Sequence, residues 1–553
     1  MKTAEAFIGF ALKLLIVEHH RGKSQGSKSP ELSPVFFHLL PLGNRMEPAC
    51  LRHTELPHTS RLFSDFLYQY HKVERFYTAP PSTGYPEDRR AALIDALRQQ
   101  NGSSESLDRL SQPGAVAVVT GQQVGLFSGP AYTIYKAITA ARHAADLTAR
   151  GRPAVPVFWL ATEDHDFAEV NHSWTFDRAN GPLQLKLDRA IHQNGYDEPV
   201  GNIRIERWPL AELRDSLKDF PFADEVVSLV EETYTPGSTM GQAFGNLLRR
   251  LLRPFGFIFI DPMHPASRQL AAPMLANACA LSQELNRLLL QRNSELEAAG
   301  YHAQVHVDAR TSLLFVLEGG KRIPMRDMRC PADDLSRRPH ELSPNALLRP
   351  VVQDYMLPTA AYVGGPAELA YFAQSQVLYE RLLGHMPRLI SRSGFTLFDA
   401  RSAKLMERYK LHVQDFFHGE DMLRERIAAR LIPPGLNEQF EQTTQSVSGQ
   451  LDRLADSLSA FDPTLRATLE KSQAKILYQL SKSRAKVARE IFRRDARAAE
   501  EAAYLYGGVF PHKHLQERFY SILPFLARHG LDLNDRLYSN VRLECPDHIL
   551  LPV

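Results

Sequence analysis

The clearest pattern of hydrophobic and polar positions lies between Ala115 and Ala161. Ala115–Thr120 is a short apolar, β-branched run, which is typical of a strand buried on both faces of a parallel sheet. A polar loop with three glycines follows, and Tyr132–Ala145 then carries apolar residues at a helical spacing. Val155–Ala161 is a second run of the buried-strand type. The order strand, glycine loop, helix, strand predicts a βαβ unit.

The remaining pattern up to residue 400 predicts further sheet strands and inserted hairpins. Phe255–Asp261 is another buried-type strand, and Pro262–Ala299 has the pattern of a long helix. Thr175–Arg207, with turn residues at 180–181 and 194–195, and Tyr301–Met325 both alternate apolar and polar residues, which predicts β-hairpins. Arg388–Asp399 predicts one more pair of short strands.

After residue 400 the pattern changes to helical periodicity. Apolar residues recur at spacings of three and four, and the series consists of Leu451, Leu454, Leu458, Phe461, Leu465, Leu469, Ile476, Leu480 and Val487. This heptad periodicity predicts a coiled-coil hairpin that serves self-association, and a helical bundle packed on its own domain is the alternative. Residues 504–553 end in a strand-like segment and are expected to fold back onto the core.

These patterns and the composition predict an α/β protein of several parts. At 553 residues the chain exceeds the size at which a single core keeps growing. We expect an α/β core at 46–400, an α-helical coiled-coil domain at 401–503 and a returning C-terminal segment at 504–553. The formal charge of +2 gives no reason to expect a nucleic acid or an anionic membrane as partner.

The N-terminal residues and the cysteines bear on the cellular compartment of the protein. No apolar run reaches the roughly 20 residues of a membrane helix, and residues 22–34 are rich in Ser, Lys, Gly and Pro. We therefore expect residues 1–45 to be a disordered extension, with Met46 as an alternative start. The four cysteines lie far apart without a CxxC pair, which indicates neither a disulfide framework nor a zinc site and fits a cytoplasmic protein.

The first candidate for chemistry is the glycine loop. Gly121–Pro130 has the spacing G-x-x-x-G-x-x-x-G-P, which matches neither the dinucleotide fingerprint nor the P-loop. Glycines permit close backbone approach, the following helix directs N–H groups and positive dipole at an anion, and Lys136 adds a charge. The alternative is a tight turn that needs glycine for its geometry alone.

The second candidate is the run Glu163-Asp164-His165-Asp166, which directly follows the second strand. Ligands of parallel sheets bind at the carboxyl ends of the strands, so both clusters fall where a site is expected. Carboxylates beside an imidazole can bind Mg²⁺, orient a substrate amine or take its proton. The alternative is a solvated acidic loop that caps the next helix. A third cluster, Tyr362, Gly364, Gly365 and Glu368, opens another predicted helix, and its role stays open between function and structure.

Three long motifs resemble one protein family. They are V-V-T-G-Q-Q-V-G-L-F-S-G-P-A-Y-T-I-Y-K-A-I, P-V-F-W-L-A-T-E-D-H-D-F-A-E-V-N-H and L-P-T-A-A-Y-V-G-G-P-A-E-L-A-Y. The sequence is similar, from about Met46 to its C-terminus, to the cysteine ligases of bacillithiol biosynthesis. The resemblance implies a Rossmann-like core with connecting insertions, and a coiled coil through which the protein forms a homodimer. The H-x-G-H motif of related synthetases is absent, and Gly129–Thr133 occupies its place.

The resemblance implies an ATP-dependent ligation of L-cysteine to glucosaminyl-malate, because an amide forms from a free carboxylate only after activation. ATP or ADP is the expected nucleotide, with Mg²⁺ as a candidate companion, and no protein-held metal is assigned. His165 is expected to act as the general base, beside Glu163, Asp164 and Asp166. The expected binding residues are Gly121, Gln122, Gln123, Gly129, Pro130, Tyr132, Thr133, Lys136, Asn171, Tyr362, Gly364, Gly365 and Glu368. Two other functions stay open: a metal-dependent hydrolase or transferase on the acidic cluster, and a dimeric nucleotide-binding scaffold without chemistry.

Overall fold

The computed structural model describes residues 47–78, 84–187, 198–325 and 338–553. The expected disordered extension with Met46, and the turn predicted at 194–195, lie outside the described residues.

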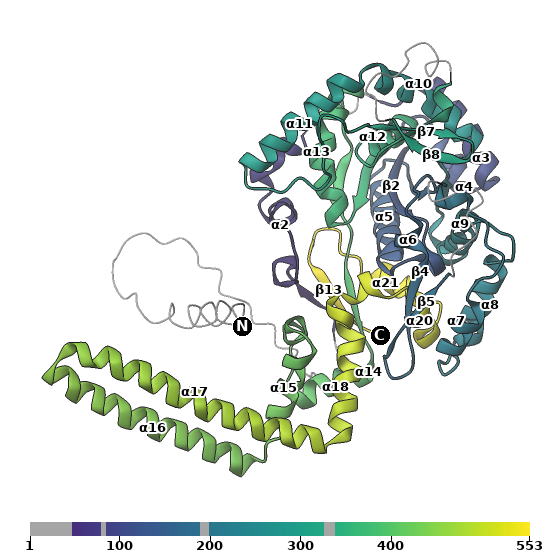
Figure 1. The fold of residues 1–553 in the computed structure, drawn as a ribbon. Helices are drawn as coiled ribbons and strands as arrows, with labels where there is room; N and C mark the ends of the chain where they lie inside the picture. The colour runs from purple at the N-terminus through teal and green to yellow at the C-terminus, as the bar shows by residue number, and fades with distance from the viewer. Residues whose placement is uncertain (1–46, 79–83, 188–197, 326–337) are drawn as a thin grey trace. The chain divides into compact units, whose positions relative to one another are not determined.

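A five-stranded parallel sheet forms the centre of the fold, as Figure 1 shows. In spatial order its strands are β11 (Arg388–Ser391), β10 (Thr359–Gly364), β2 (Val116–Gln123), β3 (Ala154–Ala161) and β6 (Ile258–Ile260). All neighbouring pairs are parallel. The predicted α/β fold with a parallel sheet is confirmed.

The strand order reverses at one position of the sheet. From β2 the sheet continues through β3 and β6 on one side, and through β10 and β11 on the other. In open parallel sheets, ligands bind at such a reversal, outside the carboxyl ends of the two strands between which it falls, here β2 and β10. We call this position the crevice.

Helices cover both faces of the sheet, because alternate residues of the strands point to opposite sides. Phe158 and Leu160 share a hydrophobic cluster with α5 (Tyr132–Ala149). Val157 and Trp159 join the opposite cluster. That cluster is built from α3 (Glu87–Asn101), α10 (Pro265–Ala280), α11 (Ser282–Ala298), α12 (Arg349–Met356) and α13 (Pro366–Leu382). The single helix predicted at 262–299 is therefore wrong, since α10 ends at Ala280 and α11 begins two residues later.

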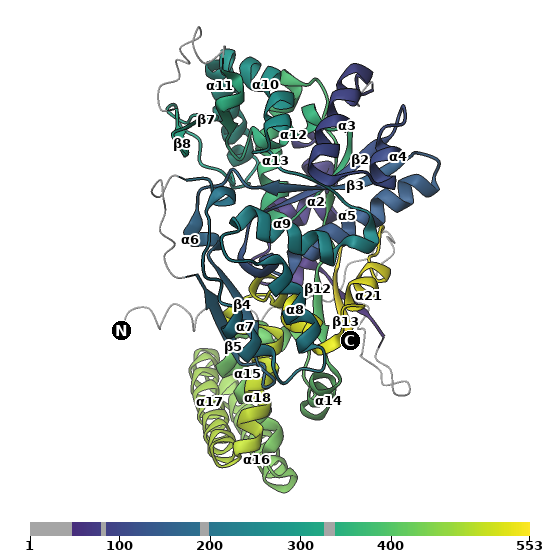
Figure 2. The ribbon, with the colours of Figure 1, turned by 90° about the vertical axis from the view of Figure 1, so that its right-hand side faces the viewer.

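Two predicted hairpins are present. β4 (His172–Phe176) pairs with β5 (Pro182–Lys186), and β7 (Leu314–Glu318) pairs with β8 (Lys321–Pro324). The short strand β9 (Leu342–Pro344) adds to the second hairpin. Figure 2 shows the two hairpins at separate positions around the central sheet.

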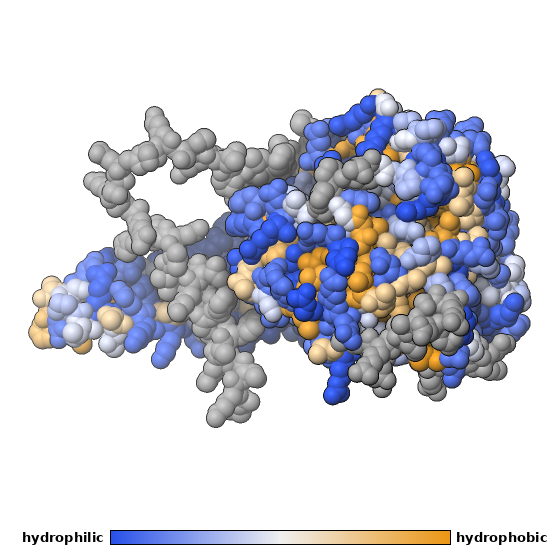
Figure 3. All heavy atoms as spheres, turned by 90° about the horizontal axis from the view of Figure 1, so that it is seen from above, coloured by the Kyte–Doolittle hydropathy of each residue, from blue (hydrophilic) through white to orange (hydrophobic). Residues whose placement is uncertain are grey.

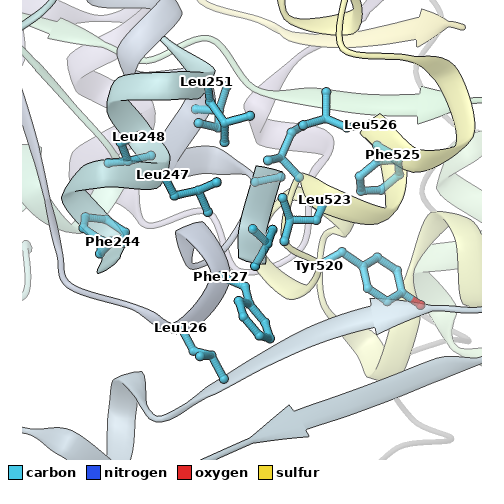
Figure 4. Packing of buried hydrophobic residues seen from close by; sticks show 14 of the residues in the cluster. Leu126, Phe127, Phe244, Leu247, Leu248, Leu251, Tyr520, Leu523, Phe525 and Leu526 are labelled. Carbon is cyan, nitrogen blue, oxygen red and sulfur yellow. The ribbon is translucent and has the colours of Figure 1, made fainter. Parts of the chain in front are cut away.

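The helices between the two hairpins share one hydrophobic core with the C-terminal segment. α7 (Leu210–Leu217), α8 (Ala223–Thr233), α9 (Met240–Leu251), α20 (Leu523–His529) and α21 (Leu533–Ser539) contribute to it. Figure 4 shows leucines of α9 facing leucines of α20, with Phe127 of the glycine loop next to them and Tyr520 on the side of α20. The C-terminal segment is therefore part of the wall behind the glycine loop.

The heptad region forms an antiparallel pair of long helices. α16 (Pro434–Phe461) and α17 (Pro463–Arg494) lie side by side in Figures 1 and 2. Asp462 makes the connection, and its side chain accepts a hydrogen bond from the backbone N–H of Thr464 at 2.8 Å, which caps α17. The pair joins the rest of the chain through α15 (Glu420–Leu431) and α18 (Ala496–Val509).

A second sheet brings together both ends of the described chain. Its strands are β1 (Ala49–Leu51), β13 (His548–Pro552) and β12 (Phe395–Phe398). The strand pair predicted at 388–399 is thus β11 and β12, which belong to different sheets. None of the helices in the described ranges is long and apolar enough to span a membrane.

Candidate active site

The polar clusters predicted from the sequence meet at one rim of the parallel sheet. Gln122 and Gln123 lie opposite Leu160 and Ala161 at the carboxyl ends of β2 and β3. The Gln123 amide donates a hydrogen bond to Asp164 Oδ2 at 2.5 Å, so the glycine loop and the acidic run are in direct contact. Because neighbouring residues of a strand point to opposite faces, Gln122 and Gln123 contact different groups.

On the face of α5, Gln122 belongs to a buried charged cluster. Lys136 forms an ion pair with Glu368 Oε2 at 2.7 Å, and it also donates to the Gly121 carbonyl and to Gln122 Oε1. An ammonium group has three hydrogens, and these three acceptors use all of them. Lys136 therefore has no hydrogen left for a phosphate, in contrast to the role expected from the sequence.

Glu368 connects this cluster to β10 and α13. It accepts hydrogen bonds from the Tyr362 hydroxyl at 2.6 Å and from the backbone N–H of Gly365 at 2.8 Å. Burial would raise the pKa of Glu368, but the charge and hydrogen bond of Lys136 outweigh it and lower the pKa. The third predicted cluster, including Gly364 at the end of β10, is thus the structural junction of the two strands that border the crevice.

The glycine loop is held closely by its surroundings. Gly129 has φ +65°, a conformation that favours glycine, and the preceding Phe127 and Ser128 also have positive φ. At the start of α5, the backbone N–H of Ala131 donates to the Tyr520 carbonyl at 2.7 Å, and that of Thr133 donates to Pro130. Fewer helix N–H groups therefore face the crevice than the sequence led us to expect, which favours a geometric role for the glycines.

Tyr132, the first residue of α5, combines a polar group with cationic neighbours. Its hydroxyl accepts a hydrogen bond from Gln122 Nε2 at 3.3 Å. The guanidinium groups of Arg392 and Arg518 lie over its ring, at 5.2 and 5.9 Å from the centroid. Arg392 is paired with Glu517, whereas Arg518 is exposed and forms no ion pair within the described ranges. Neither arginine is among the residues expected from the sequence, because both lie in segments far from the three motifs.

In the acidic run, each carboxylate has a different partner. Glu163 forms a buried ion pair with Arg268 Nη1 at 2.5 Å, and the two side chains are 7% and 9% exposed. Asp164 accepts hydrogen bonds from Gln123 and from the backbone N–H of His165 at 2.7 Å. Asp166 caps the short helix α6 (Phe167–Val170) by accepting from the N–H of Glu169. Of the three carboxylates, Asp164 is the one that contacts the glycine loop, whereas Asp166 is the more exposed.

His165 faces an arginine from the second hairpin. Its Nδ1 lies 3.1 Å from Arg322 Nη1. Arg322 stacks on Phe315 and is fixed by Ser343 Oγ at 3.1 Å and the Pro344 carbonyl at 2.7 Å. A guanidinium only donates, so His165 Nδ1 accepts, and the neutral imidazole carries its hydrogen on Nε2. In this arrangement His165 is a hydrogen-bond donor toward a ligand, which does not suit the role of general base.

Asn171 lies near the acidic run but beside the first hairpin. It is at the end of α6, where its Oδ1 is 3.2 Å from His172 Nδ1. Within the residues that the structure describes, no group of three or more His, Cys, Asp or Glu side chains could hold a metal ion.

Comparison with known families matches nearly all of the described chain. The N-terminal Rossmann-like domain of "Bacillithiol biosynthesis BshC" matches residues 46–330 and 332–393, and the C-terminal coiled-coil domain of the same family matches residues 395–552. A relative from Solibacter usitatus, named "Putative cysteine ligase BshC", is 53% identical over 92% of this chain and 100% of its own length. A relative of the same name from Koribacter versatilis is 37% identical over 92% of this chain and its whole length. The resemblance found in the sequence is confirmed: the chain belongs to the BshC family of bacillithiol biosynthesis, with a Rossmann-like domain followed by a coiled-coil domain.

Proposed function

We propose that the protein is a carbon–nitrogen ligase that joins the carboxyl group of L-cysteine to the amine of glucosaminyl-malate. The observation that carries this proposal is the match to both BshC domains together with relatives that are named as cysteine ligases over their whole length. The rim at the carboxyl ends of β2, β3 and β10 supports it, because Gln123 contacts Asp164 there and Lys136 links Gln122 to Glu368.

ATP is the proposed activating cosubstrate, because joining a free carboxylate to an amine is unfavourable in water. Arg518 is the group best suited to meet its phosphates, since it is exposed, close to Tyr132 and without an acidic partner within the described ranges. Mg²⁺ would accompany the phosphates, as it does at most sites that bind a nucleoside triphosphate. Lys136 contributes indirectly, by fixing Gln122 and Glu368 at the edge of the crevice.

At the neighbouring strand end, Asp164 and His165 are proposed to hold the amine-bearing substrate. Asp164 has lone pairs left to accept a hydrogen bond, and then a proton, from the attacking amine. His165 would donate its Nε2 hydrogen to a carboxylate or carbonyl oxygen of the substrate, held in position by Arg322. This assignment replaces the general base expected from the sequence with a donor.

The proposal is tested with the purified protein, cysteine, glucosaminyl-malate, ATP and Mg²⁺, with mass spectrometry of the coupled thiol and of the nucleotide product. His165→Ala is expected to lower turnover by about 10²-fold or more, as loss of a positioned donor does. His165→Gln is expected to retain most of the rate, because its amide nitrogen can occupy the position of Nε2. The matched control is His340→Gln, since only the backbone of His340 contacts Arg268.

Two outcomes would contradict the assignment. The ligase function would be rejected if the wild-type protein formed no coupled thiol, whichever nucleotide product is sought. If His165→Gln were as impaired as His165→Ala, and both lost the acidic limb of the pH–rate profile, His165 would be the base and not the donor.

We also propose that the protein is a cytoplasmic homodimer. The heptad helices carry hydrophobic side chains that their own hairpin leaves exposed, namely Leu454, Phe461, Leu465, Ile476 and Tyr478. In Figure 3 hydrophobic side chains also appear at the end of this hairpin. A second copy would cover them. Light scattering of the purified protein tests this directly, and a monomer at micromolar concentration would reject it.

A further inference from the structure

A cavity of about 450 Å³ lies on the open side of the edge strand β11. Aromatic residues of the N-terminal region form one wall, and the loop from Arg542 to Pro546 forms another. Three arginines are among the residues that line it, Arg388, Arg392 and Arg542, against one acidic residue, Glu544. Arg392 is neutralised by Glu517, whereas Arg388 and Arg542 are exposed and in no ion pair within the described part of the chain. The cavity thus attracts anions.

Two free thiols meet at this cavity although they come from opposite ends of the chain. Cys50 lies in β1 and Cys545 in the loop before β13, and the antiparallel pairing of these strands places Cys50 opposite Ile549. Cys545 precedes the Cys50 partner Ile549 by four residues, and the charge of Cys545 acts on the Cys50 thiol. Arg542 Nη1 lies 2.9 Å from Cys50 Sγ. Both cysteines are half-buried, and only Cys545 lines the cavity.

We propose that Cys50 and Cys545 form a thiol–disulfide exchange site for an anionic low-molecular-weight disulfide that enters through this cavity. The thiolate of Cys545 attacks one sulfur of the ligand, whose S–S bond breaks and releases one thiolate. The thiolate of Cys50 then attacks the sulfur of Cys545 and releases the second. The ligand disulfide is reduced to two thiols, the protein pair is oxidised to one disulfide, and the two protein protons pass through solvent to the released thiolates.

The order of the two steps follows from the surroundings of the thiols. Burial, followed by the charge of Cys545, raises the pKa of Cys50 to about 11, so Cys50 is protonated at neutral pH and is a poor first nucleophile. Once Cys545 carries the ligand, its negative charge is removed, and Arg542 favours the thiolate of Cys50. The identity of the natural disulfide rests on the proposed function: a thiol that carries malate carboxylates would give an anionic disulfide.

The experiment uses the full-length protein, reduced and freed of reductant, with glutathione disulfide as the anionic probe and cystamine as the cationic one. Peptide mass mapping follows residues 50 and 545. We expect wild-type protein to form the Cys50–Cys545 disulfide, Cys50→Ser to stop at a mixed disulfide on Cys545, and Cys545→Ser to leave Cys50 unmodified. Arg388→Gln should slow the reaction of glutathione disulfide by about threefold to tenfold and leave cystamine unaffected.

Several results would overturn the proposal. They are the absence of an internal disulfide in the wild type, capture of glutathione by Cys50 in Cys545→Ser at the wild-type rate, and equal rates for both probes. Thermal melting confirms that each variant is folded, and oxidation should raise the melting temperature, since the bond closes a very long loop. The experiment detects modification of the protein itself. A negative result in it can therefore be told apart from a negative result in the ligase assay.

Discussion

Glu517→Gln perturbs a buried ion pair that links the Rossmann-like domain to the C-terminal segment. Glu517 and Arg392 are 2% and 5% exposed, and Arg392 donates to both carboxylate oxygens at 2.5 and 2.9 Å. The backbone N–H of Phe395 adds a third hydrogen bond at 3.0 Å. The substitution keeps the shape of the side chain but leaves the guanidinium of Arg392 buried without its counter-charge.

The size of the effect follows from the pKa of the carboxyl group. Burial would raise the pKa of Glu517, but Arg392 lowers it from 4.5 to about 2. At about 1.4 kcal/mol per pKa unit, the charged form contributes on the order of 3 kcal/mol to the free energy of unfolding. Loss of one partner of a buried pair typically costs about 3–5 kcal/mol, which agrees.

The sign of the pH dependence is fixed by the direction of the shift. A carboxyl group whose pKa is lower in the folded state stabilises the protein above pH 4.5, and this contribution is lost as the pH falls from 4.5 to about 2. The assay is the melting temperature of the wild type and Glu517→Gln between pH 7 and pH 3. Since all other carboxyl groups are common to both proteins, the difference between them isolates Glu517.

We expect a difference of several degrees at pH 7 that shrinks below pH 4.5. The matched control is Glu284→Gln, which breaks an exposed ion pair with Arg381 and should not change the melting temperature measurably. A further variant, Glu517→Leu with Arg392→Met, should recover much of the loss, because a buried pair can be exchanged for apolar contacts. A difference that stays constant down to pH 3 would refute the reasoning.

Three other predictions test the site and its support. Glu368→Gln should lower the melting temperature and weaken substrate binding, because Lys136 loses its counter-charge. Separate determination of KM and kcat measures the effect on binding, and an unchanged melting temperature with an unchanged KM would reject the role of Glu368 at the crevice. Gly201→Ala should destabilise the protein by about 1–3 kcal/mol, since the added Cβ would lie 2.4 Å from the Cβ of Thr162. Chemical denaturation should show a lower midpoint, and an unchanged midpoint would contradict this close packing. Phe461→Ser, at a side chain that is 85% exposed, should weaken self-association in light scattering without lowering the melting temperature of the monomer, and an unchanged dimer would place the interface elsewhere.

The sequence by itself determined the elements and their class. The βαβ unit at 115–161, the hairpin within Tyr301–Met325 and the heptad helices are all present, because each is a local periodicity of burial that only one kind of backbone satisfies. The same reasoning located the glycine loop and the acidic run at one rim, since the carboxyl ends of parallel strands share an edge.

Only the tertiary structure decided what the polar residues of the rim do. Lys136 is occupied by Glu368, Glu163 by Arg268 and His165 by Arg322, and each partner lies more than a hundred residues away in the chain. A periodic pattern reports whether a position is buried, but it does not report which distant group is packed against it. The protonation and the free hydrogen bonds of a side chain depend on that group, so the roles of these residues follow from the packing and not from the motif.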